Sequence, residues 1–217
     1  MDFNLARSNM VQKQVRAWEV LDPRILNLLT LIPREQFVPA DFQALAFTDT
    51  FIPIGFNQVM LPAKIVGRAL QALNIQETES VLEIGTGTGY LTALLCHLAH
   101  KVTSVEIIPE LSLTAKHHLK ALHLQNATLE VGNGIDGWPD HGPYDVIILT
   151  GSVPLIPKAL RAQLSIHGRL FAVVGQAPAM SAVLITRINQ ELWREKVLFE
   201  TDIPALLHGP QPKAFSF

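Results

Sequence analysis

The chain has 217 residues, a formal net charge of −2 from 17 basic and 19 acidic side chains, and no long run of either sign. This balance excludes the basic surface that nucleic-acid binders need, and no apolar stretch is long enough to cross a membrane. The single cysteine, Cys96, excludes a disulfide framework. We therefore expect a cytoplasmic protein without nucleic-acid or membrane partners, in which Cys96 is a buried packing residue.

The first 78 residues form a region whose apolar side chains follow helical spacing. They are Val11, Val15, Trp18, Ile25, Leu28, Leu29 and Ile32. Asp22-Pro23 is typical of a helix N-cap followed by proline in the first turn, and Pro33 ends this helix. Residues 48–62 predict a loop or a short strand, and Pro62 then begins a helix that runs to Leu73.

From Ser80 onward, short β-rich runs alternate with helical stretches. The predicted strands are 81–84, 102–105, 128–131, 146–149 and 170–174. Helices are predicted between the first two pairs of strands and at 155–164, and such alternation indicates a parallel sheet with helices on both faces. Two last strands, 182–188 and 193–199, are predicted to form an antiparallel hairpin at the sheet edge.

The tail after Thr201 contains Pro204, Gly209, Pro210 and Pro212 and is predicted to be irregular. We therefore divide the chain into an N-terminal helical region, 1–78, packed on a doubly wound α/β core, 79–217.

Residues 81–90 predict a buried strand, a glycine-rich turn and the start of a helix. Gly85, Gly87 and Gly89 alternate, whereas the dinucleotide fingerprint requires its third small residue at the position of Tyr90. Glu83, two residues before the first glycine, is poorly suited to a pyrophosphate but is compatible with a cationic ligand. The motif therefore predicts S-adenosylmethionine, which carries a sulfonium and an amino group.

Other candidate ligand-binding residues follow the ends of the next strands, where ligands bind in doubly wound sheets. The Glu106 carboxylate is placed to accept hydrogen bonds from both ribose hydroxyls. Asn133, between two glycines, either contacts the adenine or belongs to a simple turn, and Thr150 either lines the cleft or caps its strand.

No group of His, Cys and acidic residues has the spacing of metal ligands, and no nucleophile elbow is present. We expect no metal. Methyl transfer needs neither a metal nor a protein nucleophile, because alignment of donor and acceptor supplies on the order of 7–11 kcal/mol of barrier reduction.

Most of the chain resembles the protein-L-isoaspartate O-methyltransferase family. The segments that carry the resemblance are 37–39, 46–49, 52–55, 82–90, 104–111, 132–134, 137–139, 144–148 and 168–170. The resemblance implies a class I, Rossmann-like methyltransferase with a mostly parallel seven-stranded sheet. It also implies methylation of the α-carboxylate of isoaspartyl residues in damaged proteins, with S-adenosylhomocysteine as product.

The resemblance also implies site residues. Cofactor binding is expected at Glu83, Gly85, Thr86, Gly87, Thr88, Gly89, Glu106, Ile107, Asn133, Gly134 and Thr150. Substrate binding is expected at Ile54, Gly55, Gln58, Val59, Met60 and Lys64. The chain departs from the family at Leu61, which occupies the position of the family's active-site serine and lacks its hydroxyl.

Three functions therefore stay open. The first is isoaspartyl methylation by alignment, with isoaspartyl proteins or peptides as partners and the protein a monomer or dimer. The second is methylation of a more apolar small-molecule acceptor, suited to Val59, Met60 and Leu61. The third is a catalytically weakened module that binds the cofactor or docks a partner.

Overall fold

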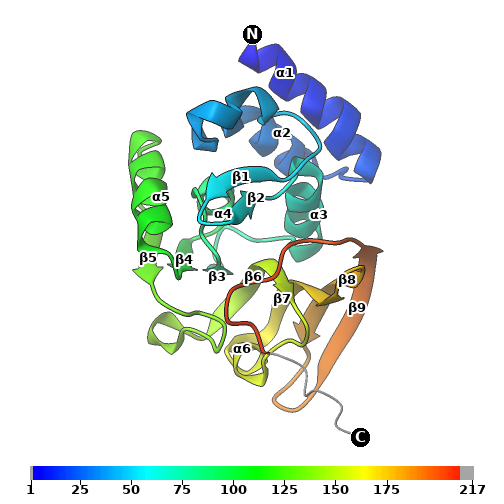
Figure 1. Ribbon diagram of the computed structural model, residues 1–217. Helices are drawn as coiled ribbons and strands as arrows, with labels where there is room; N and C mark the ends of the chain where they lie inside the picture. Colours follow the sequence, from blue (N-terminus) through cyan, green and yellow to red (C-terminus); the bar gives the residue numbers. More distant parts are fainter. Residues whose placement is uncertain (1, 211–217) are drawn as a thin grey trace, which may run out of the picture.

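The computed structural model describes residues 2–210, so the predicted tail residue Pro212 lies outside the described part. A seven-stranded sheet with the strand order β5-β4-β3-β6-β7-β8-β9 forms the centre of the fold (Figure 1). The first five strands of this order run parallel, whereas β8 pairs antiparallel with both β7 and β9. The predicted mostly parallel, seven-stranded sheet with an antiparallel C-terminal hairpin is confirmed.

The elements of the core alternate as the sequence predicts. Their bounds are β3 Ser80–Ile84, α4 Tyr90–Leu98, β4 Lys101–Glu106, α5 Pro109–Ala121, β5 Ala127–Val131, β6 Tyr144–Val153, α6 Lys158–Ala162, β7 Leu164–Gln176, β8 Ala179–Arg187 and β9 Trp193–Glu200. A short 3₁₀ turn, Pro139–His141, lies between β5 and β6.

Two sequence predictions differ from these bounds. The helix predicted at 155–164 is only α6, because Pro154 and Pro157 restrict the chain before it. Strand β7 begins at Leu164 rather than Leu170, and its first residue pairs with Tyr144 of β6. Pairing with a neighbouring strand therefore overrides the weak local signal of Ser165, Ile166 and His167.

The N-terminal region is helical, as predicted. It contains α1 (Phe3–Met10), a π-helical turn (Val11–Val15), a 3₁₀ turn (Arg16–Trp18), α2 (Pro23–Leu31) and two further 3₁₀ turns (Arg34–Phe37 and Ala40–Leu45). The Asp22 side chain caps α2 by accepting a hydrogen bond from the Arg24 backbone N–H at 2.9 Å.

Residues 48–62 contain a two-stranded antiparallel hairpin, β1 (Ile52–Gly55) and β2 (Gln58–Met60). Phe56 and Asn57 form its turn with φ of 53° and 56°, the backbone of a type I′ hairpin turn. Helix α3 (Ala63–Leu73) follows directly after Pro62, as predicted.

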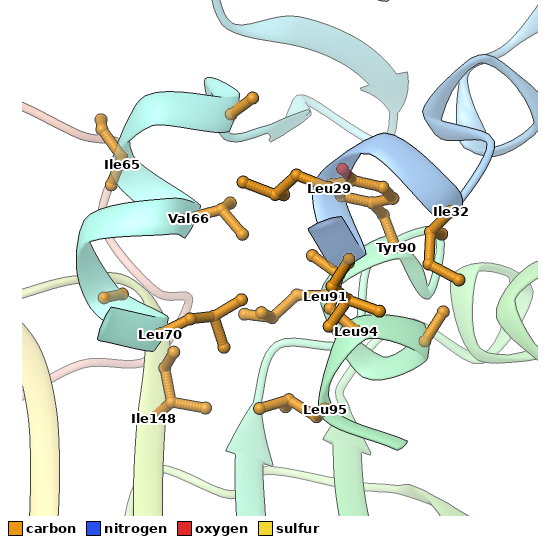
Figure 2. Close-up of a cluster of buried hydrophobic side chains, with 14 of the residues drawn as sticks. Leu29, Ile32, Ile65, Val66, Leu70, Tyr90, Leu91, Leu94, Leu95 and Ile148 are labelled. Carbon is orange, nitrogen blue, oxygen red and sulfur yellow. The ribbon is translucent and has the colours of Figure 1, made fainter. Parts of the chain in front are cut away.

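The sheet packs apolar residues on both faces with the two-residue period of a strand. Val81 and Val146 join the cluster formed with α2, α3 and α4, whereas Leu82 and Ile147 join the cluster that includes Leu160 of α6. Figure 2 shows the first cluster, where Val66 and Leu70 of α3 face α4. Because this cluster unites residues of both predicted regions, the boundary at residue 78 stays a prediction.

The segment after β9 has little regular structure, as predicted for this tail. It runs back across the carboxyl end of the sheet, where Ala205 forms a parallel bridge with Ser152 of β6 (Figure 1, red). The Ser152 N–H donates to Pro204 O at 2.9 Å, and the Leu206 N–H donates to Ser152 O at 2.9 Å. The hydrogen bonds place residues far from the glycine motif in sequence beside the ends of β3 and β6.

Candidate active site

One cavity lies at the carboxyl ends of β3, β4 and β6 and extends to the β1–β2 hairpin, with about 1000 Å³ of space that is partly open to solvent. Most predicted site residues line it. They are Ile54, Gln58, Val59, Met60, Leu61, Glu83, Gly85, Thr86, Gly87, Thr88, Glu106, Ile107, Asn133, Gly134 and Thr150. Gly55, Lys64 and Gly89 are not among the lining residues.

The glycine turn has positive φ at all three glycines, a backbone that favours glycine. Gly85, Gly87 and Gly89 have φ of 94°, 56° and 89°. A Cβ at Gly85 would collide with the Thr150 hydroxyl, which donates to the Gly85 carbonyl at 2.8 Å. Gly89 has a structural role instead, because it caps α4 and a Cβ there would lie 3.0 Å from the Ala115 Cβ.

Glu106 ends β4 with a carboxylate that is 5% exposed and already oriented. Its Oε2 accepts from the Gly87 N–H at 2.8 Å, and its Oε1 accepts from the Ile108 N–H at 3.0 Å. A carboxylate has about four lone-pair sites, so both oxygens retain capacity for the hydroxyls of a ribose.

Glu83 is fully buried, and Thr92 and Ser104 both donate to its Oε2, at 2.5 Å and 2.6 Å. Its Oε1 has no hydrogen-bond partner among the described residues. Burial raises the pKa of Glu83 to about 8, against the opposing effect of the two hydroxyl donors. The pKa of this carboxyl therefore lies well above that of an exposed glutamate, whereas the sequence suggested an ordinary carboxylate.

At the carboxyl end of β5, neighbouring side chains pack closely on two glycines of the cavity wall. A Cβ at Gly132 would lie 2.9 Å from the Trp138 ring, and one at Gly134 would lie 2.7 Å from Ile84 Cδ1. The Asn133 Oδ1 accepts from the Ile135 N–H at 3.2 Å. Asn133 therefore belongs to a turn, as one of the two predictions stated, and it also lines the cavity. There its side-chain amide could contact the adenine ring of the cofactor.

At the hairpin end, the cavity wall is mostly apolar and contains Ile54, Val59, Met60 and Leu61. The predicted substrate residue Lys64 instead pairs with Asp49 at 2.5 Å and lies 4.2 Å from the centre of the Trp18 ring. These contacts give no support for a substrate-binding role of Lys64.

The sequence prediction missed the C-terminal wall of the cavity. Pro204, Ala205, Leu206 and Leu207 line it, and Leu206 packs so closely on Gly151 that a Cβ there would lie 2.9 Å from the Leu206 N. No local motif marks these residues. Hydrogen bonds of Pro204 and Leu206 with Ser152 hold this segment at the site.

Among residues 2–210 no group of three or more His, Cys, Asp or Glu side chains is arranged to hold a metal ion. Over the same range no helix is long and apolar enough to span a bilayer. Cys96 is buried, as predicted, and burial raises its pKa to about 12, so it is not a reactive thiolate.

Comparison with known proteins identifies the family to which this cavity belongs. The family model described as "Protein-L-isoaspartate(D-aspartate) O-methyltransferase (PCMT)" matches residues 6–203. The chain belongs to this family. The family resemblance in the sequence is thus confirmed, and so is the predicted methyltransferase class.

Relatives of the same name cover most of both chains. Protein-L-isoaspartate O-methyltransferase of Syntrophus aciditrophicus (strain SB) is 40% identical over 190 residues, which span 88% of this chain and 87% of the relative. The enzyme of Synechococcus sp. (strain JA-2-3B'a(2-13)) is 38% identical over 203 residues, 91% of this chain and 83% of the relative.

Solved structures of this family share the fold of the chain. A protein-L-isoaspartate O-methyltransferase superposes with a TM-score of 0.80 at 23% identity, over 92% of this chain and 65% of that chain. A second, from Plasmodium falciparum in complex with S-adenosyl-L-homocysteine, superposes with a TM-score of 0.78 at 16% identity, over 92% and 97% of the two chains.

The cavity of this PCMT-family chain fits S-adenosylmethionine, the methyl donor that the glycine motif predicted. Gly85 and Gly87 leave bare backbone at the end of β3, and the carboxylate of Glu106 lies at the end of β4. The unpartnered Oε1 of Glu83 offers an acceptor for an ammonium group. The described residues of the cavity are thus suited to a ligand that combines a nucleoside with a positively charged amino-acid group.

Proposed function

We propose that this protein transfers the methyl group of S-adenosylmethionine to the α-carboxylate of an isoaspartyl residue in a protein or peptide. The close approach of two segments carries the proposal. A Cβ at Gly87 would lie 3.3 Å from Ile54 Cδ1, so the glycine turn and the β1–β2 hairpin form adjoining walls of one cavity. The region expected to bind the methyl donor is therefore directly beside the region expected to bind the acceptor.

The bound cofactor supplies an activated methyl group on a sulfonium. In the transfer, a carboxylate oxygen forms a bond to the methyl carbon as the carbon–sulfur bond breaks, which yields a methyl ester and S-adenosylhomocysteine. A carboxylate is already ionised at neutral pH, so the protein need not remove a proton. Its task is to hold the two reactants in line.

The residues of this chain support that task in three ways. Glu106 and the glycine turn orient the donor, and Glu83 faces its cationic end. The apolar side chains of Ile54, Met60 and Leu61 exclude water from the hairpin end. Water exclusion strengthens the attraction between an anionic acceptor and a cationic donor.

Leu61 limits the rate of this reaction rather than preventing it. A hydrogen bond to a charged group typically contributes about 1.5–3 kcal/mol, which corresponds to roughly ten- to a hundredfold in rate or affinity. The alternative acceptor is a more apolar small molecule, to which the side chains of Val59, Met60 and Leu61 are suited. A buried Cys96 and bacterial relatives support the predicted cytoplasmic location, and monomer or dimer stays the predicted oligomeric state.

A methyl-transfer assay tests the proposal. Purified protein is incubated with labelled donor and either an isoaspartyl peptide or the same peptide with a normal aspartate. We expect transfer to the isoaspartyl peptide alone. Binding of the cofactor without transfer above the aspartyl control would reject the isoaspartyl acceptor, and a parallel screen of apolar small molecules would then test the alternative.

A further inference from the structure

Arg34 is a fully buried arginine that sits behind the hairpin end of the cavity. It begins the 3₁₀ turn Arg34–Phe37, and its guanidinium donates two hydrogen bonds to backbone carbonyls. Its Nε donates to Ala46 O at 2.8 Å, and its Nη2 donates to Leu61 O at 2.8 Å. Arg34 thus fixes the backbone of the residue at the serine position of the family.

The same guanidinium also contacts the donor side. Its central carbon lies 4.8 Å from the centre of the Tyr90 ring, close enough for a cation–π interaction. Tyr90 is the first residue of α4, directly after the glycine turn, and lines the cavity together with Leu61. One side chain therefore links the two walls between which a methyl group would pass.

The charge of Arg34 is not balanced by a carboxylate among the described residues. The neighbouring Glu35 pairs with Arg7 instead, and the Nη1 of Arg34 has no hydrogen-bond partner over residues 2–210. Burial lowers the pKa of Arg34, yet a guanidinium stays protonated in proteins. In a water-poor interior such a charge acts over several ångströms, and it favours an anion over a neutral group in the adjoining cavity.

We propose that Arg34 is a positioning residue that fixes the Leu61 backbone, contacts the Tyr90 ring and supplies the positive charge by which the cavity prefers a carboxylate acceptor. The inference rests on the proposed function, because it assigns a residue to the recognition of the isoaspartyl α-carboxylate. It also explains how an acceptor loop without the serine hydroxyl retains an attraction for an anion.

The test compares two ligands that differ only in charge. Calorimetry on the full chain saturated with S-adenosylhomocysteine measures the affinity for an isoaspartyl peptide and for its analogue with a carboxamide in place of the α-carboxylate. We expect wild type to prefer the carboxylate by roughly tenfold or more, because a buried charge without a carboxylate partner attracts an anion across a water-poor wall. Arg34→Met should lower that ratio to about twofold or less, whereas Arg34→Lys should restore part of it.

Arg187 provides a control, since it also donates to backbone carbonyls, those of Ala162, Leu164 and Asn189, and lies 5.7 Å from the Trp193 ring centre. Arg187→Met should lower the melting temperature and leave the carboxylate preference unchanged. If Arg34→Met fails to bind S-adenosylhomocysteine, Arg34→Gln, which keeps an N–H donor without the charge, takes its place.

An uncharged Arg34 variant that binds S-adenosylhomocysteine and keeps the wild-type preference would overturn the inference, because Arg34 would then be a structural residue only. That result leaves the proposed function intact if wild type methylates the isoaspartyl peptide. A wild-type protein that neither binds nor methylates the peptide would reject both.

Discussion

The carboxylate of Glu106 accepts a hydrogen bond from the backbone N–H of Gly87 at 2.8 Å. This bond joins the end of β4 to the glycine turn after β3, so the residue expected to bind the ribose also shapes the turn beside it. Loss of the carboxylate would remove both effects. The Glu106 side chain is therefore a sensitive point for testing where the cofactor lies.

Replacing Glu106 with alanine should weaken S-adenosylmethionine binding by roughly tenfold or more, since at least one hydrogen bond to a charged group is lost. Calorimetry with wild type and variant measures the change. Glu110→Ala is the matched control, because Glu110 is an exposed acid in the first turn of α5 and should leave the affinity unchanged. Equal affinities of wild type and Glu106→Ala would show that the ribose lies elsewhere.

Gly85→Ala should abolish measurable cofactor binding. The new methyl group would collide with the Thr150 hydroxyl, and the φ of 94° is strained for alanine. Gly55→Ala separates strain from collision, because Gly55 has a similar φ of 88° but no atom within 4 Å of an added Cβ. We expect Gly55→Ala to lower the melting temperature without removing cofactor binding. Cofactor affinity close to wild type in Gly85→Ala would contradict the shape of the turn.

The affinity for S-adenosylmethionine should rise with pH toward about 8 and fall at higher pH, where the α-ammonium group of the ligand loses its proton. The pKa of Glu83 is about 8 in the ligand-free protein because the carboxyl is buried, and a cationic ligand favours its ionised form. Binding below pH 8 must therefore release a proton, and the affinity gains up to roughly tenfold per pH unit. Calorimetry in buffers of different ionisation enthalpy counts the released protons.

Glu83→Gln is the control for this pH dependence. It removes the ionisable group, while the titration of the ligand itself is the same for both proteins. We expect a flatter affinity profile for the variant. A pH dependence as steep as that of wild type would assign the released proton to another group.

The ligand-free protein should also lose stability as the pH rises from 4.5 toward 8. The pKa of Glu83 is raised in the folded state from 4.5 to about 8, so over this interval the folded chain keeps a proton that the unfolded chain releases. The contribution of Glu83 to the free energy of unfolding then falls by up to about 1.4 kcal/mol per pH unit and is constant above pH 8. Urea denaturation of wild type and Glu83→Gln across this range measures the difference.

Leu61→Ser should raise the rate of isoaspartyl methylation by roughly tenfold if the missing hydroxyl limits the reaction. The Leu61 carbonyl is held by Arg34 at 2.8 Å, so the substitution changes the side chain of an already fixed backbone. Steady-state assays with the isoaspartyl peptide give kcat and KM. Leu113→Ser, at an exposed position of α5, should have no effect, and no gain in Leu61→Ser would mean that the acceptor site differs from the family elsewhere.

The sequence alone determined the elements whose signals are local. Alternating apolar runs predicted the parallel strands, because a strand buried on both faces must be apolar along its length. Asp22 and Pro23 located the start of α2, and the alternating Gly85, Gly87 and Gly89 located the cofactor turn. In each case the signal is local, so neighbouring residues suffice to read it.

Only the tertiary structure decided which residues without a local motif or a strand-end position reach the cavity. Pro204–Leu207 reach the site through hydrogen bonds with Ser152, Arg34 meets Leu61 and Tyr90 across the fold, and Lys64 pairs with Asp49. The raised pKa of Glu83 likewise follows from burial, which depends on everything packed around the carboxyl. Desolvation and long-range contacts are properties of the folded chain, and no local pattern encodes them.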